Sequence, residues 1–242
     1  MGIFKFTTLT STNDYMKNNF RQFNEYDIVT AENQTAGKAR RGNCWVSQKG
    51  MALFTFMVKK KEYFSSEDSE YLKIPLLAGL AVIKGLEKSE NFNYMFKWTN
   101  DVYLEGKKMS GILVEKVEDT FFIGIGININ NSLPEELGDK AVSLTDITGR
   151  RYDIDKIITD VIDEFKILYK MFTDGRWNEI LAKINSLNYL KGKEVTLKTG
   201  ERRFRGVVRN INYEGEIEII SENEVHSFSI GEVFEEGISF LR

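Results

Sequence analysis

The spacing of apolar and polar residues predicts a β-sheet in the first 130 residues. Runs rich in β-branched and aromatic residues, bounded by polar or glycine-containing turns, are typical of strands. Such runs cover residues 4–6, 27–32, 52–58, 94–98, 109–117 and 120–127. A polar turn joins the fourth run to the fifth, so we predict that these two strands form a hairpin.

Helical spacing predicts four helices. The first covers residues 14–19, and Ser11 or Thr12 is a suitable N-cap for it. The second covers residues 75–88, with Pro75 near the first turn, where proline is tolerated. Apolar residues that recur every three or four positions predict two longer amphipathic helices, at residues 155–172 and 176–185.

The pattern changes after residue 189. Short strand-like runs separated by glycine-containing turns follow, at residues 194–198, 203–211, 216–220 and 225–230. Regular short strands are typical of a small β-barrel. We therefore predict two domains, residues 1–189 and 190–242. The predicted fold class is α+β, with a mixed, mainly antiparallel sheet that carries helices on one face, followed by the barrel.

Composition argues against several classes of partner. Of the 242 residues, 42% are hydrophobic, which is enough for a substantial core. The net charge is −3, and residues 190–242 carry ten acidic and eight basic residues, so we predict no nucleic-acid partner. No apolar run reaches the roughly 18 residues that span a bilayer, and no signal peptide begins the chain, so we expect no membrane association.

The chain has one cysteine, Cys44, and one histidine, His226. A single cysteine excludes an intramolecular disulfide and favours a reducing, cytoplasmic location. Zinc sites built from His and Cys lack ligands. The chemistry would therefore depend on Lys, Arg, Asp, Glu or backbone groups.

Residues 33–61 contain seven basic and no acidic residues. An anion between these cations would relieve their mutual repulsion. Gly37 and Gly42 let the backbone approach a ligand closely. A solvated basic loop is the alternative interpretation, and a P-loop is excluded because its lysine-containing pattern is missing.

Three shorter segments carry weaker signals. Residues 97–115 predict a hairpin with cations and an acid at one end, although an ordinary turn with surface lysines would look the same. The Gly-x-Gly at 124–126 suggests that another group packs against a strand, but it lacks the remaining features of a dinucleotide fingerprint. Residues 11–13, Ser-Thr-Asn, can be a simple helix cap.

Taken in this order, the segments resemble the biotin–protein ligase family. The resemblance runs from about residue 6 to the end and implies a class II synthetase-like sheet followed by an SH3-like barrel. Some members carry an N-terminal DNA-binding domain, and the early first strand leads us to expect a monofunctional ligase without one. The matching motifs are Ser-Thr-Asn at 11–13, Gln-x-x-Gly-Lys-Ala-Arg-Arg-Gly-x-x-Trp at 34–45, Lys-Trp-x-Asn-Asp-Val-Tyr-Leu at 97–104, Lys-Lys-x-x-Gly-Ile-Leu-Val-Glu at 107–115 and Gly-Ile-Gly-Ile-Asn-Ile-Asn at 124–130.

The resemblance implies a two-step reaction. Biotin and ATP would form biotinyl-5'-AMP, with Mg²⁺ carried by ATP and no metal ligand assigned on the protein. Biotin would then pass to a lysine of a biotin carboxyl carrier protein domain in a biotin-dependent carboxylase. Both groups that react in the first step are anions, so fixed cations lower the barrier, and no histidine base is needed. A homodimer is compatible with this reading.

By resemblance, the catalytic residues are Arg40, Lys97, Asp101 and Lys108. Arg40 would hold the adenylate phosphate, Lys108 would bind the activated carboxyl group, and Asp101 would assist attack by the acceptor lysine. We expect the three cations to converge on one pocket. Biotin would contact Ser11, Thr12, Asn13, Gln34, Gly37, Lys38, Ala39, Arg40, Lys108, Gly111 and Ile112. ATP and the adenylate would contact Arg40, Arg41, Trp45, Lys97, Asn100, Lys108 and Asn128.

The chain departs from the usual family pattern at several positions. Lys38 and Ala39 stand where Arg-Gly is usual, Asn43 stands where the family often has an arginine, and Thr99 stands where it has a proline. Lysine keeps the charge but loses the bidentate geometry of arginine, so we expect weaker retention of the intermediate. We also expect the basic segment to become ordered over biotinyl-adenylate and to exclude water.

Two other functions compete with this reading. A lipoate–protein ligase would share the fold and the adenylate chemistry, but the paired lysines at 107–108 and the Lys-Trp-x-Asn-Asp motif favour biotin. The second competing reading is a non-catalytic protein, either a biotin-binding homologue or an adaptor built around the barrel. The presence of Arg40, Lys97, Asp101 and Lys108 argues against it.

Overall fold

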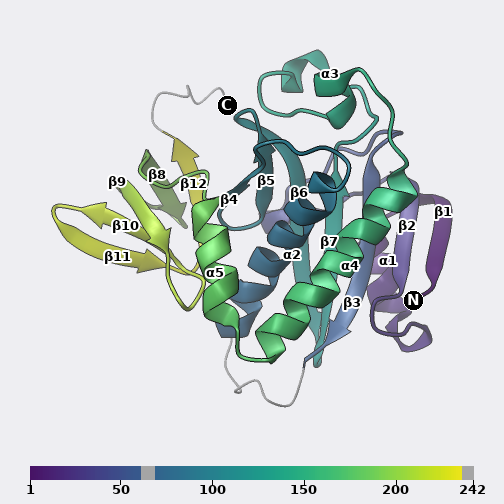
Figure 1. The fold of residues 1–242 in the computed structure, drawn as a ribbon, viewed down its shortest axis with the longest axis horizontal. Helices are drawn as coiled ribbons and strands as arrows, with labels where there is room; N and C mark the ends of the chain where they lie inside the picture. The colour runs from purple at the N-terminus through teal and green to yellow at the C-terminus, as the bar shows by residue number, and fades with distance from the viewer. Residues whose placement is uncertain (61–68, 236–242) are drawn as a thin grey trace.

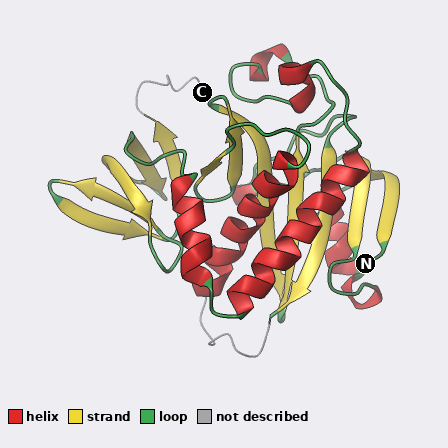
Figure 2. Cartoon of the chain, in the orientation of Figure 1, coloured by secondary structure: helices red, strands yellow, loops and turns green. Residues whose placement is uncertain are grey.

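The computed structural model describes residues 1–60 and 69–235. Within this part of the chain, seven strands form one sheet in the order β1-β2-β3-β7-β6-β5-β4 (Figures 1 and 2). β1 is parallel to β2 and the other neighbours are antiparallel, which confirms the predicted mixed sheet. The strands are β1 (Ile3–Leu9), β2 (Ile28–Gln34), β3 (Ala52–Lys59), β4 (Met95–Lys97), β5 (Asp101–Leu104), β6 (Lys107–Val117) and β7 (Thr120–Ile127).

Two long helices cover one face of this sheet. They are α2 (Ser69–Glu87) and α4 (Ile154–Thr173), and they pack against each other (Figure 1). Phe56 of β3 meets Phe165 of α4 with ring centroids 4.8 Å apart. Alternate residues of β3 and β7 point to this side, so the large apolar core lies between the sheet and the two helices.

The opposite face carries the short helix α1 (Thr12–Asn18), and Ser11 is its N-cap as predicted. The predicted arrangement, with helices on one face of the sheet, therefore holds for α2 and α4. The short helix α1 lies on the other face and leaves room beside it. Met16 of α1 packs there in a second, smaller apolar cluster, which also contains Val29, Met57 and Phe122.

Before residue 190, the sequence prediction was wrong at three elements. α2 begins well before residue 75, so Pro75 lies inside the helix. The lost backbone hydrogen bond is outweighed because α2 is buried along most of its length. The strand β5 and the short helix α3 (Leu144–Thr148) were not predicted, whereas α5 (Trp177–Ser186) was. Because β5 pairs with both β4 and β6, the predicted direct hairpin between the runs 94–98 and 109–117 was wrong. Among the described residues, no helix is both long and apolar enough to cross a bilayer.

The C-terminal segment forms the predicted small β-structure. In its described part, antiparallel strands follow the order β11-β10-β9-β8-β12, and the last of them was not predicted. Its buried side chains join the core of the large sheet, so a domain boundary after residue 189 stays a prediction; residues 236–242 lie outside the described part. The strands are β8 (Glu194–Thr199), β9 (Arg202–Ile211), β10 (Ile217–Ser221), β11 (Glu224–Phe228) and β12 (Glu232–Glu235).

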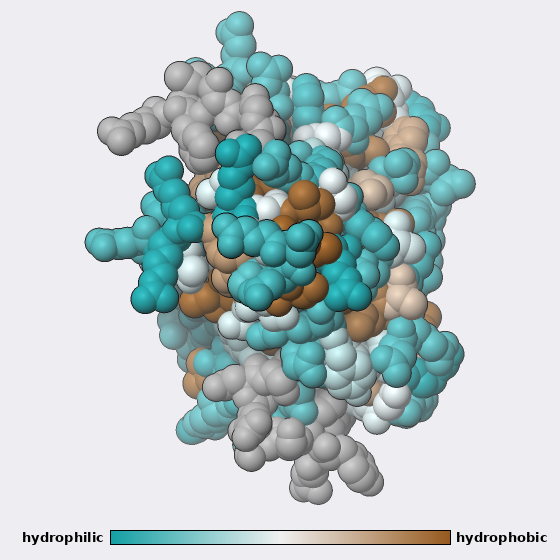
Figure 3. Space-filling model, turned by 90° about the vertical axis from the view of Figure 1, so that its left-hand side faces the viewer, coloured by the Kyte–Doolittle hydropathy of each residue, from teal (hydrophilic) through white to brown (hydrophobic). Residues whose placement is uncertain are grey.

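The barrel presents an apolar row to solvent. Val207, Ile220 and Val225 lie opposite one another on three neighbouring strands and are exposed. Figure 3, which views the molecule from the barrel side, shows apolar residues surrounded by hydrophilic ones. The charged residues that flank the row pair with each other, as Arg205 does with Glu194.

Candidate active site

The floor of the candidate site is made of glycines on two paired strands. Gly111 of β6 lies directly opposite Gly126 of β7. A Cβ atom added to Gly126 would lie 2.6 Å from the indole of Trp45, and one added to Gly111 would lie 2.7 Å from it. A Cβ atom on Gly124 would lie 2.1 Å from Oδ1 of Asn13. The predicted close packing against this Gly-x-Gly is confirmed, because only glycine leaves room for these side chains.

One wall is polar and comes from the start of α1. The backbone N–H of Thr12 donates to Oε1 of Gln34 at 2.7 Å, and its hydroxyl lies 3.1 Å from the same oxygen. Asn13 donates to Glu115 at 2.9 Å and accepts from Thr55 at 2.6 Å. These helix residues are nearly fully buried. Each is fixed by hydrogen bonds, so the wall is preorganised for a polar ligand.

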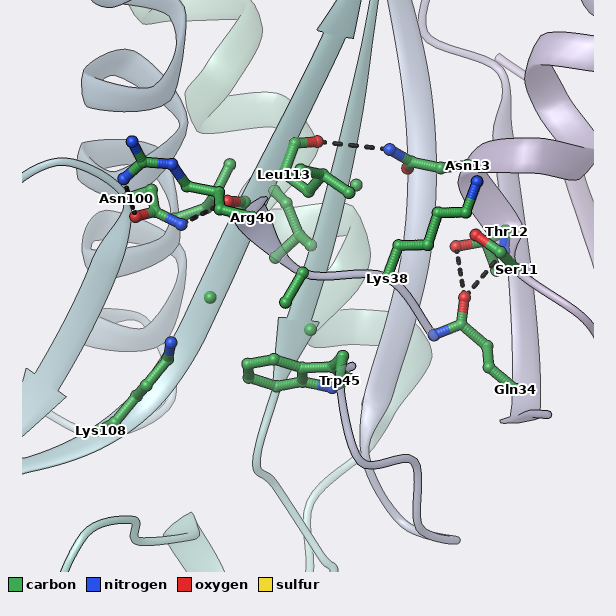
Figure 4. A pocket seen from close by; sticks show the side chains of 16 residues that line it. Ser11, Thr12, Asn13, Gln34, Lys38, Arg40, Trp45, Asn100, Lys108 and Leu113 are labelled. Atoms are coloured by element: carbon green, nitrogen blue, oxygen red, sulfur yellow. Dashed lines mark hydrogen bonds between the residues drawn. The ribbon is translucent and has the colours of Figure 1, made fainter. Parts of the chain in front are cut away.

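The second wall is a loop, residues 35–45, which we call the basic loop. It folds back on itself, with Trp45 N–H donating to the carbonyl of Gly37 at 2.9 Å. It turns through Arg41 and Gly42, which have φ of 58° and 76°, and glycine adopts such values without strain. The turn brings Lys38 and Arg40 to the same side as the floor (Figure 4).

Charged contacts join the basic loop to three other parts of the molecule. Lys38 pairs with Asp14 of α1 at 2.7 Å, and Arg41 lies 3.8 Å from Glu232 of β12. The guanidinium of Arg40 contacts the hydroxyl of Thr99 and Oδ1 of Asn100, the latter at 3.0 Å. All three connections depend on residues distant in sequence.

The third side is a lysine on β6. Nζ of Lys108 lies 2.8 Å from Oδ1 of Asp101 and 5.4 Å from the centroid of the Trp45 ring. Asn100 stands beside it and donates to the carbonyl of Ile112 at 2.7 Å. The Lys108 side chain is 32% exposed, so its ammonium is accessible to a ligand.

These groups surround a pocket that is open to solvent. Burial lowers the pKa of Arg40, and the neighbouring Arg41 acts in the same direction, so an anion here would meet a poorly hydrated guanidinium. The lining residues are Ser11, Thr12, Asn13, Gln34, Lys38, Ala39, Arg40, Trp45, Asn100, Lys108, Gly111, Ile112, Leu113, Gly124, Ile125 and Gly126 (Figure 4).

Twelve of the residues that the sequence predicted therefore line one pocket, and five lie elsewhere. Gly37 packs against the backbone of Trp45 and shapes the basic loop. Arg41 points toward Glu232, and Asp101 reaches the pocket through its pair with Lys108. Asn128 is buried, and its Oδ1 accepts a hydrogen bond from Asn131 at 3.2 Å.

Lys97 is not among the residues that line the pocket, and its predicted role in catalysis and ATP binding stays a prediction. Its ammonium lies 3.5 Å from Glu235 of β12 and 3.2 Å from the hydroxyl of Tyr103. The attraction of a nearby buried carboxylate draws the side chain toward the barrel. Arg40 and Lys108 do share the pocket.

Sequence reasoning missed Leu113, Thr55 and Glu115. Residues 111, 113 and 115 alternate along β6 and so share a face, which means that strand periodicity could have identified Leu113 and Glu115. Thr55 lies on β3, in a run whose other residues are all apolar, and no local sequence signal marks it as a site residue.

The sequence model of the family described as "Biotin/lipoate A/B protein ligase family" matches residues 3–130, more than half of the chain. The chain belongs to this family.

Individual relatives agree with this assignment. The chain is 31% identical to the biotin protein ligase of Aquifex aeolicus, solved in complex with biotin and ATP, with a TM-score of 0.85 over 96% of this chain and 97% of that one. It is 29% identical over 208 residues to the bifunctional ligase/repressor BirA of Bacillus subtilis, covering 83% of this chain and 63% of that protein. It is 25% identical to the biotin–[acetyl-CoA-carboxylase] ligase of Mycobacterium tuberculosis, covering 78% and 71%.

Proposed function

We propose that the protein is an ATP-dependent biotin–protein ligase. The observation that carries this proposal is the pocket: a hydrogen-bonded polar wall, a glycine floor and two cations, Arg40 and Lys108, around one space. The Aquifex protein of the same fold is solved with biotin and ATP. The Mycobacterium tuberculosis relative is named a biotin–[acetyl-CoA-carboxylase] ligase, and this favours biotin over lipoate within a family that includes both.

In the first step, a carboxylate oxygen of biotin attacks the α-phosphorus of ATP. The bond from that phosphorus to the oxygen bridging to the β-phosphate breaks, and pyrophosphate leaves with the oxygen. Arg40 and Lys108 would stabilise the negative charge that accumulates on the phosphoryl oxygens. The ureido ring would bind at the polar wall, where Thr12 and Asn13 are held in place. Mg²⁺ would arrive with the triphosphate.

In the second step, the neutral amine of an acceptor lysine attacks the acyl carbon of biotinyl-5'-AMP. The bond between that carbon and the phosphate oxygen breaks, AMP leaves, and the nitrogen loses a proton. Asp101 would orient the amine or take that proton. Its Oδ1 accepts no hydrogen bond within the described residues beyond the ion pair with Lys108, so it retains capacity to accept one.

The basic loop would protect the intermediate. Trp45 lies against the floor between Gly111 and Gly126, and its indole would cover the adenylate. Because the mixed anhydride is hydrolysed by water, a closed loop preserves it until the acceptor arrives. Lys38, in place of the usual arginine, is already engaged by Asp14 and would add less to this closure.

We propose the carrier-protein domain of a biotin-dependent carboxylase as the acceptor and a cytoplasmic location, which the single free cysteine supports. A homodimer is a further proposal, since β1 is an edge strand with exposed Ile3 and Phe4 and edge strands can pair between copies. Light scattering of the purified protein would report the oligomeric state.

The reaction is tested with the purified chain, a carrier domain, biotin and MgATP. Mass spectrometry should find biotin on one carrier lysine, and pyrophosphate release should require biotin. Lipoate in place of biotin should support neither. Pyrophosphate release with lipoate alone would reassign the substrate, and binding of biotin without pyrophosphate release would indicate a non-catalytic homologue.

A further inference from the structure

The segment that precedes β5 is a fixed part of the site. The indole N–H of the buried Trp98 donates to the carbonyl of Gly215 in the barrel at 3.0 Å. The side-chain amide of Asn100 donates to the carbonyl of Ile112 at 2.7 Å, and the backbone carbonyl of Asn100 accepts from the N–H of Ile112 at 2.9 Å. Thr99 lies between these two anchored residues, so its side chain starts from a rigid backbone.

The hydroxyl of Thr99 contacts the basic loop. It accepts a hydrogen bond from Nη1 of Arg40 and donates to Oδ1 of Asn100 at 3.1 Å. The same Nη1 donates to Oδ1 of Asn100 at 3.0 Å, and Figure 4 shows the guanidinium beside this amide. The three side chains therefore form a closed triangle of hydrogen bonds, in which each polar atom orients the other two.

This triangle uses only one nitrogen of the guanidinium. A guanidinium carries five N–H groups, and within the described residues Arg40 donates only through Nη1 and forms no ion pair. Arg40 is partly buried and lines the pocket, and the oxygens that contact it are neutral. Nη2 and Nε are therefore left for an anion, and the charge of the guanidinium strengthens a hydrogen bond to a phosphate.

We propose that Thr99 is a positioning residue for Arg40: its hydroxyl and Asn100 hold Nη1, so that Nη2 and Nε are free for the phosphate of biotinyl-5'-AMP. This rests on the proposed ligase function. The ion pairs of Lys38 and Arg41, which also attach the basic loop, are exposed and contribute little. The triangle instead ends at a rigid segment beside the pocket. A proline, which is usual in the family at position 99, has no side-chain oxygen and could not form it.

The Thr99 hydroxyl would offset what the basic loop lacks elsewhere. Lys38 and Asn43 offer fewer donors than the arginines that are usual at their positions, which is why we expect weak retention of the intermediate. An arginine that is already held in place loses less side-chain freedom when it binds a phosphate. Retention by Arg40 should therefore depend on Thr99 in this chain.

The test is the release of preformed, labelled biotinyl-5'-AMP, measured by filter binding in an excess of the unlabelled compound. T99V keeps the shape of the side chain but cannot hydrogen-bond to Arg40 or Asn100, so release should become roughly tenfold faster. T99A should behave like T99V, and T99S should restore release to within about threefold of the wild-type rate. T30V is the matched control, because Thr30 is partly buried, donates one hydrogen bond, to Leu53, and does not line the pocket.

A second comparison separates positioning from a general structural effect. R40M removes the guanidinium, so the further change T99V should leave the release rate of R40M unaltered, because the group that Thr99 positions is already absent. If Thr99 only supported the packing of the segment before β5, T99V would accelerate release by the same factor with or without Arg40.

The outcomes separate the two proposals. Absence of biotin-dependent pyrophosphate release by the wild-type protein would overturn the ligase function itself. The positioning role would be overturned, with the ligase intact, if T99V and T99A matched T30V, if T99S released the adenylate as fast as T99V, or if T99V kept its full effect in R40M. Thermal unfolding of each variant verifies that it is folded.

Discussion

Gly126→Ala tests whether the glycine floor positions Trp45. The added Cβ atom would lie 2.6 to 2.8 Å from three atoms of the indole, whereas ordinary contact begins at 3.4 Å. The ring has to retreat by about 0.8 Å, and it can do so because it sits on a loop whose other contacts are polar and partly exposed. The substitution should therefore move the cover of the pocket without disturbing the core.

The expected magnitude follows from the contacts that the movement weakens. The Trp45 ring would lose part of its stacking on the adenylate, about 1 kcal/mol, and part of its contact with Lys108, about 0.5 kcal/mol. Together these correspond to release of biotinyl-adenylate roughly tenfold faster. The free energy of unfolding should change by less than about 1 kcal/mol, since Trp45 is only half-buried.

Gly124→Ala is the matched control on the same strand. Its Cβ atom would displace Asn13, which is buried and hydrogen-bonded to Thr55 and Glu115. That should cost about 2–4 kcal/mol of stability. Adenylate release is measured by filter binding after a single turnover, and stability by urea unfolding. Wild-type release by Gly126→Ala, or a loss of stability as large as that of Gly124→Ala, would refute the proposed role of the floor.

Four further predictions concern the charged groups. Lys108→Gln should slow biotin-dependent pyrophosphate release by roughly 10²–10³-fold with little change in thermal unfolding; a change below tenfold would remove Lys108 from the first step. Arg40→Gly should release biotinyl-adenylate and label unrelated proteins, and a variant that still labels only its carrier would contradict the assignment. Limited trypsin cleavage after Arg40 and Arg41 should slow when biotin and ATP are present together, and equal rates would argue against loop closure. Burial would raise the pKa of Asp14, but hydrogen bonds from Lys38 and Lys17 lower it overall. The stabilising effect of the Asp14 carboxylate should thus be present above about pH 4 and be lost as pH falls through the lowered pKa. The difference in free energy of unfolding between wild type and Asp14→Asn should therefore shrink in urea melts at acid pH.

The strands and long helices were predictable because their signals are local. The runs at 52–58 and 120–127 are β-branched and aromatic, and they match β3 and β7 nearly residue for residue. β5 was missed because it is four residues long and opens with the polar Asn-Asp turn. It forms only because β4 and β6 pair with it on both sides, and local propensity does not contain that information.

The same difference between local signals and long-range contacts applies to the site. Its residue types were readable from motifs, and twelve predicted residues meet in one pocket. The contact that holds Lys97 could not be predicted from the motif, since its partner Glu235 lies 138 residues away. Strand register brings Lys97 onto the pocket face, but packing of the barrel decides where the ammonium goes. A motif records which charges are present and not which of them are already paired.

The two faces of the sheet divide stability from chemistry. On β7, residues 123, 125 and 127 pack under the helices, while Gly124 and Gly126 face the pocket and bury almost no side-chain area. Most of the sheet's hydrophobic free energy therefore comes from the helix face, and the pocket face is free to serve binding. The basic loop above it is attached by contacts to Asp14, Asn100 and Glu232, and exposed ion pairs of this kind contribute little. An adenylate that adds contacts to Arg40 and Trp45 can thus determine the position of the loop. The weak attachment that lets substrates enter therefore also lets the bound intermediate draw the basic loop closed over itself.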